Sequence, residues 1–355
     1  MLLIDFSTPP EFKDLFSKLQ GILGQEEANI FRETYGFYYD QNPVALKVTT
    51  SGSTGTPKTY TFSRSAVCTS IEGTAKALGL DLGITALLAL PLRFIAGRMM
   101  LLRAMHLKWK LLWIKPTLRL KEFPEVDFAA LTPAQVSESL HVLGSIHTLL
   151  LGGSPITNAL LATIRNTAKY SVYQSFAATE TLSNFALRRL APDYQDFYTV
   201  LPGVKIRVDE LSRLWVLYPG ITADFITTGD VVKMVDPSSF IWLGRADFVI
   251  NTGGVKVHPE FLEAQLSEAF PDKRFIITSM PDERLGEAVT IVIESPVELN
   301  TDNLKRTLEK IASEKHLPKH LLPRIHVTVP ELPVTATGKP DRIRIKQLIN
   351  NEHEK

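Results

Sequence analysis

The sequence predicts an α/β protein with a large amino-terminal domain over residues 1–244 and a small α+β domain over residues 245–355. Short apolar runs alternate with helical patterns between residues 86 and 174, which is typical of mostly parallel sheets covered by helices. Residues 186–243 carry short alternating strands, which predict a small β-rich lobe. The chain of 355 residues is long enough for two domains.

The composition is that of an ordinary soluble globular protein, with 45% hydrophobic and 22% charged residues. A net charge of +1 argues against nucleic-acid binding through phosphate contacts. The single cysteine, Cys68, excludes an intrachain disulfide framework and a cysteine-based zinc site. No stretch is long and apolar enough to be a signal peptide or a membrane span, so we expect a cytoplasmic protein. The sequence leaves open whether the chain forms a homodimer.

The apolar patterns predict the elements in order. Two helices precede residue 43, the second over residues 25–38, and a strand over residues 44–48 leads into a polar loop. Ser63 is the expected N-cap of the next helix. The remaining elements of the large domain are strands at 86–90, 110–114, 128–131, 148–151, 171–174, 205–208, 213–218, 231–236 and 240–243, and helices at 63–80, 98–106 and 133–143. The small domain has strands at 248–251, 274–280, 288–294 and 324–329, and helices at 259–270, 302–316 and 342–354.

The polar loop at residues 49–58 reads T-T-S-G-S-T-G-T-P-K. Glycines and hydroxyl residues after a strand favour binding of phosphate oxygens by backbone N–H groups and side chains. The best-known phosphate loop, G-x-x-x-x-G-K-[ST], would need a glycine where this chain has Pro57. Because ligands lie beyond the carboxyl ends of parallel strands, we expect this loop to meet residues 152–155 and 175–181 at one sheet edge.

Six stretches in the same order resemble the motifs of the adenylate-forming enzymes, which include acyl-CoA synthetases, peptide-synthetase adenylation domains and luciferases. They are residues 50–58 (T-S-G-S-T-G-T-P-K), 150–155 (L-L-G-G-S-P), 176–181 (F-A-A-T-E-T), 228–230 (T-G-D), 244–259 (G-R-A-D-F-V-I-N-T-G-G-V-K-V-H-P) and 333–342 (P-V-T-A-T-G-K-P-D-R). The resemblance implies that a carboxylate attacks the α-phosphate of ATP, which gives an acyl-adenylate and pyrophosphate.

The resemblance also implies a role for each motif. Glu180 would bind Mg²⁺, Thr179 would contact a phosphate, and Lys339 would bridge the substrate carboxylate and the α-phosphate. Asp230 would accept hydrogen bonds from the ribose hydroxyls, with Arg245 nearby. The departing phosphates would be held by Thr50, Ser51, Gly52, Ser53, Thr54, Gly55 and Lys58, and the adenine side by Gly152, Gly153, Ser154 and Pro155. Each of these residues taken alone is more often an ordinary surface lysine, turn former or solvated carboxylate.

Asp247 stands at the position where, by the resemblance, the small domain rotates between two half-reactions. In one half-reaction Lys339 faces the active site. In the other, the hairpin with Gly253, Gly254 and Lys256 lines a tunnel for CoA, whose thiol displaces AMP. The implied cofactors are therefore ATP, Mg²⁺ and CoA, and the implied partner is a small carboxylic acid.

Three departures from the family pattern are present. The family has a longer segment before the phosphate loop, and a motif that reads Tyr-Gly there reads Phe176-Ala177 here. The family's P-x-x-H-x-x-G stretch reads P-L-R-F-I-A-G over residues 91–97, with Phe94 at the position of the aromatic gate. Residues 179–190 (T-E-T-L-S-N-F-A-L-R-R-L) look like the o-succinylbenzoate–CoA ligases of menaquinone biosynthesis. That acid has a second carboxylate, which needs a counter-charge; Arg103 is preferred to Arg98. Together with Arg103, the expected acyl-binding residues are Phe94, Phe176 and Ser183, and Asn184 would lie near the same pocket.

Three alternatives remain open at this point. The chain could be another aryl- or acyl-CoA synthetase, or an adenylation enzyme that loads a carrier protein. A non-catalytic nucleotide-binding descendant is the third, and binding alone would not require Lys339.

Overall fold

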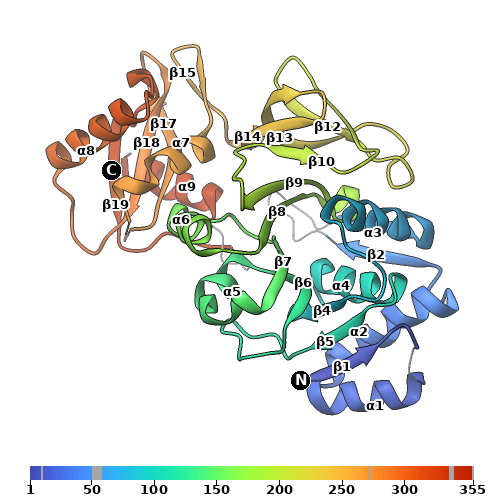
Figure 1. The fold of residues 1–355 in the computed structure, drawn as a ribbon. Coiled ribbons are helices and arrows are strands. Elements are labelled where there is room, and N and C mark those ends of the chain that lie inside the picture. The colour runs from blue at the N-terminus through green and yellow to red at the C-terminus, as the bar shows by residue number, and fades with distance from the viewer. Residues whose placement is uncertain (9–10, 50–57, 272, 336–339, 354–355) are drawn as a thin grey trace.

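The computed structural model describes residues 1–8, 11–49, 58–271, 273–335 and 340–353. A sheet of twelve strands runs through the amino-terminal part, and a separate sheet of five strands lies in the carboxyl-terminal part (Figure 1). The first sheet has the order β1-β5-β4-β6-β7-β8-β9-β10-β14-β13-β12-β11, so the predicted β-rich lobe continues the same sheet. The α/β fold class predicted from the sequence is confirmed.

The parallel part of the large sheet consists of five strands in the order β5-β4-β6-β7-β8. Their bounds are β4 Thr85–Leu88, β5 Lys110–Trp113, β6 Val126–Leu131, β7 Ile146–Leu151 and β8 Ser171–Ala177. The residues of β4, β5, β6 and β7 are mostly apolar and buried, as expected for strands covered on both faces, whereas only Val172 is fully buried in β8. Strand order reverses between β4 and β6, and such a switch point is where open α/β sheets bind ligands.

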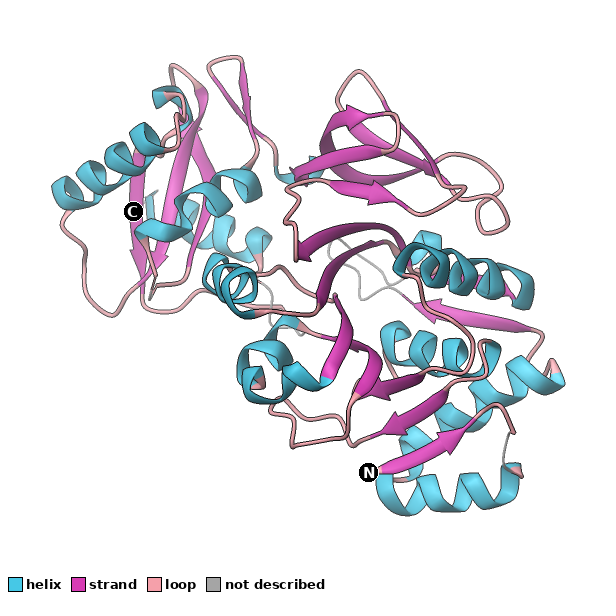
Figure 2. Ribbon diagram, in the orientation of Figure 1, coloured by secondary structure: helices cyan, strands magenta, loops and turns pink. Residues whose placement is uncertain are grey.

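Helices cover both faces of this sheet (Figure 2). Their bounds are α1 Phe12–Leu23, α2 Gln25–Tyr35, α3 Arg64–Leu78, α4 Ile95–His106, α5 Pro133–Glu138 and α6 Asn158–Thr167. The predicted N-cap of α3 is confirmed, because Oγ of Ser63 accepts a hydrogen bond from N of Ala66 over 3.2 Å. The helix predicted over residues 25–38 is shorter, since its end continues as the π-helix Gly36–Asp40.

The polar loop joins two strands rather than a strand and a helix. β2 (Ala45–Thr49) pairs antiparallel with β3 (Thr59–Ser63), which reads T-Y-T-F-S and precedes α3 directly. The sequence did not predict β3, because its threonines and serine read as a continuation of the loop. β1 (Leu2–Asp5), which pairs with β5 at the sheet edge, was missed as well.

The antiparallel part of the large sheet begins where β8 meets β9 (Asn184–Ala191). Its other strands are β10 Tyr198–Val200, β11 Lys205–Val208, β12 Arg213–Leu217, β13 Ile226–Asp236 and β14 Ser239–Arg245. β9 and β10 were not predicted. β13 and β14 pair so that Asp230 lies opposite Arg245, which brings two predicted site residues together.

The carboxyl-terminal sheet has its own apolar cores, one of which includes Ile250, Leu262 and Ile291. The sheet contains β15 Ile250–Thr252, β16 Val255–Val257, β17 Phe275–Asp282, β18 Gly286–Glu294 and β19 Ile325–Val329, with helices α7 Pro259–Leu266, α8 Thr301–Glu314 and α9 Arg342–His353. Asn158 of α6 donates a hydrogen bond to the backbone O of Ala264 in α7 over 2.8 Å. A helix that packs on the large sheet therefore contacts a helix of the carboxyl-terminal part.

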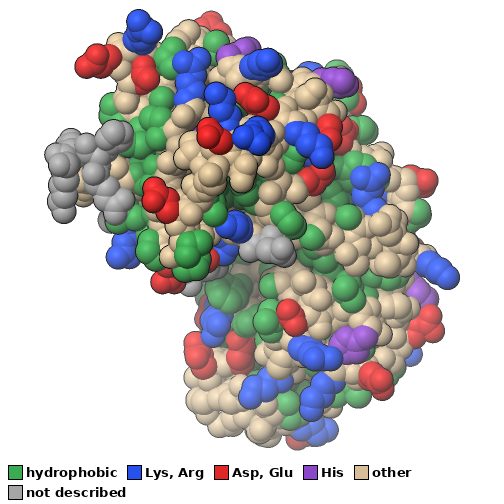
Figure 3. Space-filling model, turned by 90° about the vertical axis from the view of Figure 1, so that its left-hand side faces the viewer, with side chains coloured by type: hydrophobic (Ala, Val, Ile, Leu, Met, Phe, Trp, Pro, Cys, Tyr) green, Lys and Arg blue, Asp and Glu red, His purple; other side chains and the backbone are tan. Residues whose placement is uncertain are grey.

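Acidic and basic side chains are interspersed over the face drawn in Figure 3, in keeping with the near-zero net charge. Within the part of the chain that the structure describes, no helix combines the length and the apolar character that a membrane crossing requires.

Candidate active site

The loops after β7 and β8 meet, as predicted from the parallel pairing of these strands. Oγ of Ser175 donates a hydrogen bond to the backbone O of Leu151 over 2.9 Å. A Cβ atom at Gly152 would lie 2.6 Å from that Oγ atom, so a larger residue there would displace the Ser175 hydroxyl from Leu151. Residues 152–155, with Gly153, Ser154 and Pro155, therefore begin beside the strand that leads to Glu180.

A 3₁₀ turn, Thr179–Thr181, carries the predicted Mg²⁺ ligand. It ends at Leu182, a non-glycine residue with φ of 66°, which is strained backbone of the kind that clusters at functional sites. Glu180 Oε1 accepts a hydrogen bond from the hydroxyl of Tyr60 in β3 over 3.1 Å. This contact joins β3, which follows the polar loop, to the turn that carries Glu180. The end of the polar loop therefore lies near the loops that follow β7 and β8.

Several predicted residues lie outside the described residues. They are Thr50, Ser51, Gly52, Ser53, Thr54, Gly55 and Lys339. Lys58, which the structure does describe, is exposed and directly precedes β3.

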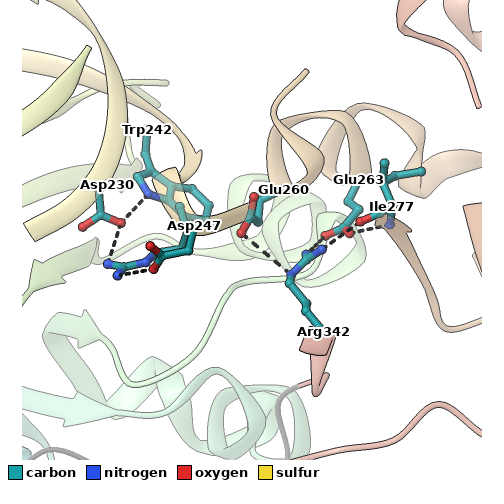
Figure 4. A network of polar contacts seen from close by, with 8 residues as sticks. Asp230, Trp242, Asp247, Glu260, Glu263, Ile277 and Arg342 are labelled. Atoms are coloured by element: carbon teal, nitrogen blue, oxygen red, sulfur yellow. Dashed lines mark hydrogen bonds and ion pairs between the residues drawn. The ribbon is translucent and has the colours of Figure 1, made fainter. Parts of the chain in front are cut away.

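The predicted ribose ligand and the predicted hinge residue share one guanidinium group (Figure 4). Nη1 of Arg245 lies 3.7 Å from Oδ1 of Asp230, and Nη2 donates to Oδ2 of Asp247 over 3.3 Å. The same Oδ1 atom of Asp230 accepts a hydrogen bond from Nε1 of Trp242 over 2.9 Å. The arrangement fixes Asp230 and connects it to the start of the carboxyl-terminal part.

Burial raises the pKa of Asp230, and the charge of Arg245 offsets part of that rise. The residue is only 9% exposed, although its side chain can carry a charge. A buried carboxylate held by two donors is a strong acceptor for hydroxyl groups. Its chemistry therefore fits the two ribose hydroxyls of a nucleotide.

The two arginines weighed as acyl-site cations have different surroundings. Arg98 lies 3.6 Å from Glu33 of α2 and donates through Nε to the backbone O of Leu92. Arg103 is 3% exposed and forms no ion pair with a carboxylate among the described residues. Burial lowers the pKa of Arg103 to about 10, so its guanidinium stays charged at neutral pH. Arg98 therefore has an acidic partner, whereas the buried Arg103 has none among the described residues.

The other predicted acyl-site residues lie before α4, in β8 and before β9. Phe94 directly precedes α4 and is 51% exposed. Phe176 in β8 is half-buried, and its ring packs edge-on against Phe185, with the centroids 5.5 Å apart. Ser183 follows the strained Leu182, and its Oγ donates to Oδ1 of Asn184 over 3.1 Å.

The predicted CoA-tunnel residues occupy the β15–β16 hairpin. Gly253 and Gly254 have φ of 56° and 82°, which favours glycine at both positions of the turn. Lys256 is exposed in β16. This hairpin is attached to β18 by the Gly253 N–H, which donates to the backbone O of Leu285 over 2.9 Å.

A buried ion-pair group lies behind the hinge (Figure 4). Arg342 donates through Nη2 to Oε2 of Glu263 over 2.5 Å and through Nη1 to the backbone O of Ile277 over 2.9 Å. Its Nε atom lies 3.8 Å from Oε1 of Glu260. The start of α9, three residues after Lys339, is therefore anchored on α7 and β17.

Sequence reasoning missed three residues that contact predicted site residues: Tyr60, Thr74 and Trp242. Trp242 lies twelve positions from Asp230 and could have been found from the strand register. Tyr60 and Thr74 come from distant segments, and no local pattern identifies them. Asn184, which the sequence places near the acyl pocket, contacts Arg103. Among the described residues, no group of three or more His, Cys, Asp or Glu side chains could hold a metal ion, so Glu180 would need phosphate oxygens as further Mg²⁺ ligands.

The model of the AMP-binding enzyme family matches residues 32–214, which is just over half of the chain. The chain belongs to the AMP-binding enzyme family. A solved structure, that of the acyl-CoA synthetase (AMP-forming)/AMP-acid ligase II-like protein of Dyadobacter fermentans, is similar to this chain at 30% identity, with a TM-score of 0.57. The match covers 91% of this chain and 93% of that one.

Two further similarities concern o-succinylbenzoate enzymes. The 2-succinylbenzoate–CoA ligase of Staphylococcus epidermidis is 23% identical over 89% of this chain and 72% of its own length. The Bacillus subtilis o-succinylbenzoate CoA synthetase, solved with its acyl-adenylate intermediate, has a TM-score of 0.70 at 20% identity and is covered over 68% of its chain. That structure shows that the fold is shared.

Proposed function

We propose that this AMP-binding enzyme is an AMP-forming acid–CoA ligase and that its acid is o-succinylbenzoate, an intermediate of menaquinone biosynthesis. A carboxylate oxygen of the acid attacks the α-phosphorus of ATP, and pyrophosphate leaves. The sulfur of CoA then attacks the acyl carbon, and AMP leaves. The relatives named 2-succinylbenzoate–CoA ligase support this proposal.

The observation that carries the choice of acid is the buried charge of Arg103. A guanidinium that is 3% exposed and has no carboxylate partner among the described residues is costly to bury. An acid with a second carboxylate would supply the missing anion. A simple monocarboxylic acid would leave Arg103 unpaired.

In the proposed site, this chain's residues bind and orient the substrates. Asp230 and Arg245 hold the ribose, and residues 152–155 lie on the adenine side. Glu180 would hold Mg²⁺, which supplies charge neutralisation at the phosphates when bound. Lys339 stabilises the charge that develops between the acid and the α-phosphate. The hairpin with Gly253, Gly254 and Lys256 lines the path of CoA, with rotation at Asp247 between the two half-reactions.

The first test is pyrophosphate release over a panel of carboxylic acids that includes o-succinylbenzoate and benzoate. We expect release with o-succinylbenzoate that depends on ATP and Mg²⁺. Release with benzoate alone would move the function to another aryl-CoA synthetase. No release with any acid would favour a non-catalytic nucleotide-binding protein.

A second test separates the two half-reactions. Lys339→Ala should abolish adenylate formation but retain thioester formation from a supplied acyl-adenylate and CoA. Equal loss of both steps would contradict the two-orientation scheme. Offering CoA and a pantetheinylated carrier protein to the same acyl-adenylate distinguishes a CoA ligase from a carrier-loading enzyme.

A further inference from the structure

Three side chains from three elements surround the Arg103 guanidinium. Nη2 of Arg103 on α4 donates to Oδ1 of Asn184 over 3.2 Å and to Oγ1 of Thr74 on α3 over 3.4 Å. Nη1 points to Sδ of Met100, a weak acceptor, at 3.9 Å. All these protein acceptors are neutral. They orient the cation without neutralising it.

Asn184 is the central member of this cluster. It is 2% exposed at the first position of β9, immediately after the turn that carries Glu180. Its Oδ1 atom accepts from Arg103 and also from the hydroxyls of Thr74, over 3.3 Å, and Ser183, over 3.1 Å. Because the guanidinium of Arg103 has only hydrogen-bond donors, the amide oxygen of Asn184 must face it. The amide nitrogen, Nδ2, therefore points away from that hydrogen bond.

Two buried donors of this cluster have no hydrogen-bond acceptor among the residues that the structure describes. They are Nδ2 of Asn184 and Nε of Arg103. A buried donor without an acceptor costs the free energy of its lost hydration, and native proteins rarely leave two such donors next to each other. One of them belongs to a cation, so the missing group is an acceptor with negative charge. A carboxylate has two oxygens that could serve both donors.

We propose that Asn184 determines the specificity of this site for acids with a second carboxylate, by holding the Arg103 guanidinium through Oδ1 and donating from Nδ2 to the carboxylate that is not activated. The proposal rests on the proposed function, because it assumes that an acid binds beside α4. An aspartate at this position would form the ion pair itself and exclude the substrate's charge. Asparagine has the same shape and keeps the guanidinium available.

Asn184→Asp tests this proposal with an almost isosteric change. We would compare kcat/KM for o-succinylbenzoate with that for 4-oxo-4-phenylbutanoate, which lacks the ring carboxylate. The ratio of the two values should fall roughly 10- to 100-fold in the variant, the size expected for losing a charge-assisted contact. The melting temperature of the free protein should rise, because Arg103 gains a buried anionic partner. Asn166→Asp, at an exposed position of α6, is the matched control and should leave the ratio unchanged.

The two proposals fail in different ways. If wild-type protein uses o-succinylbenzoate and Asn184→Asp keeps the same ratio, the role of Asn184 is wrong and the proposed function stands. If wild-type protein releases pyrophosphate with neither acid, the proposed function is wrong. In that case, calorimetric titration with o-succinylbenzoate tests whether Asn184 contacts the second carboxylate. Weaker binding by Asn184→Asp than by wild type supports this contact, and equal affinity overturns it.

Discussion

The backbone N–H of Leu92 donates a hydrogen bond to Oε2 of Glu27 over 2.9 Å, across 65 positions of the chain. Helix α2 thereby holds the loop between β4 and α4, and Glu33 of the same helix adds the ion pair with Arg98. This loop leads to Phe94 and to the helix that carries Arg103. The amino-terminal helices therefore position the part of the molecule where we expect the acid to bind.

Glu27→Ala should remove this hydrogen bond and loosen the start of α4. We expect the KM for the acid to rise while the KM for ATP stays near its wild-type value, with a loss of about 1.5–3 kcal/mol in the free energy of unfolding. Steady-state kinetics and urea denaturation measure the two effects. Glu26→Ala, at an exposed neighbouring position, is the control. An unchanged KM for the acid in Glu27→Ala would contradict the positioning role of α2.

Gly229→Ala should weaken ATP binding. Gly229 has φ of 71°, and a Cβ atom there would lie 2.7 Å from Nη2 of Arg245, which would have to leave its place between Asp230 and Asp247. Gly79→Ala matches the backbone strain without the clash, since Gly79 has φ of 63° and open space around its Cβ position. Both variants should lose about 1–2 kcal/mol of stability. Only Gly229→Ala should raise the KM for ATP; a normal KM would show that Arg245 is not needed there.

Gly97→Ala should destabilise the fold, because its Cβ atom would lie 2.3 Å from the backbone O of Pro91. A backbone atom cannot move aside cheaply, so we expect a loss of about 1–3 kcal/mol. The matched control is Gly21→Ala in α1, where nothing lies within 4 Å of the Cβ position. That variant should gain about 0.5–1 kcal/mol. Thermal denaturation of the two variants measures the contrast, and equal melting temperatures would show that the Pro91–Gly97 contact relaxes freely.

Glu263→Gln should change the pH dependence of stability. Burial raises the pKa of Glu263 from 4.5 to about 6, against the opposing effect of Arg342. A carboxyl whose pKa is higher in the folded state stabilises the fold at low pH, and this stabilisation is lost as pH rises to about 6. The free energy of unfolding of wild type, minus that of Glu263→Gln, should therefore fall by about 2 kcal/mol as pH rises from about 3 to about 7.5, with more than half of the fall between the two pKa values.

Urea denaturation at several pH values measures that difference, and Glu309→Gln on the exposed face of α8 is the control. A difference that rises with pH would mean that the ion pair with Arg342 outweighs burial.

Most of the parallel strands were predictable because each contains a short apolar run, such as Ala86–Leu88 in β4 and Leu149–Leu151 in β7. β3 was missed because Thr59 and Thr61 face solvent and only Phe62 is buried, so the run resembles the loop before it. β1 has four residues and is a strand only through its pairing with β5. Such edge strands depend on a partner that lies far away in the sequence.

The order of the site loops and the meeting of two of them at one sheet edge were predictable, whereas the side-chain contacts that join distant segments were not. Glu180 and Asp230 stand in short motifs with glycine, threonine or glutamate at fixed spacing. Asn184 contacts Arg103 across 81 positions and Tyr60 contacts Glu180 across 120, and only the folded sheet brings each pair together. A single sequence contains no information about such pairs beyond the residue types.

The hydrogen bond from Tyr60 to Glu180 makes one tyrosine an optical probe of the site. Burial raises the pKa of Tyr60, and the hydrogen bond and charge of Glu180 raise it further. A cation bound to Glu180 would withdraw that negative charge and make Tyr60 ionise at lower pH. Since tyrosinate absorbs at longer wavelength than tyrosine, an alkaline absorbance titration with and without Mg²⁺ and nucleotide would follow occupancy of the site without any added label.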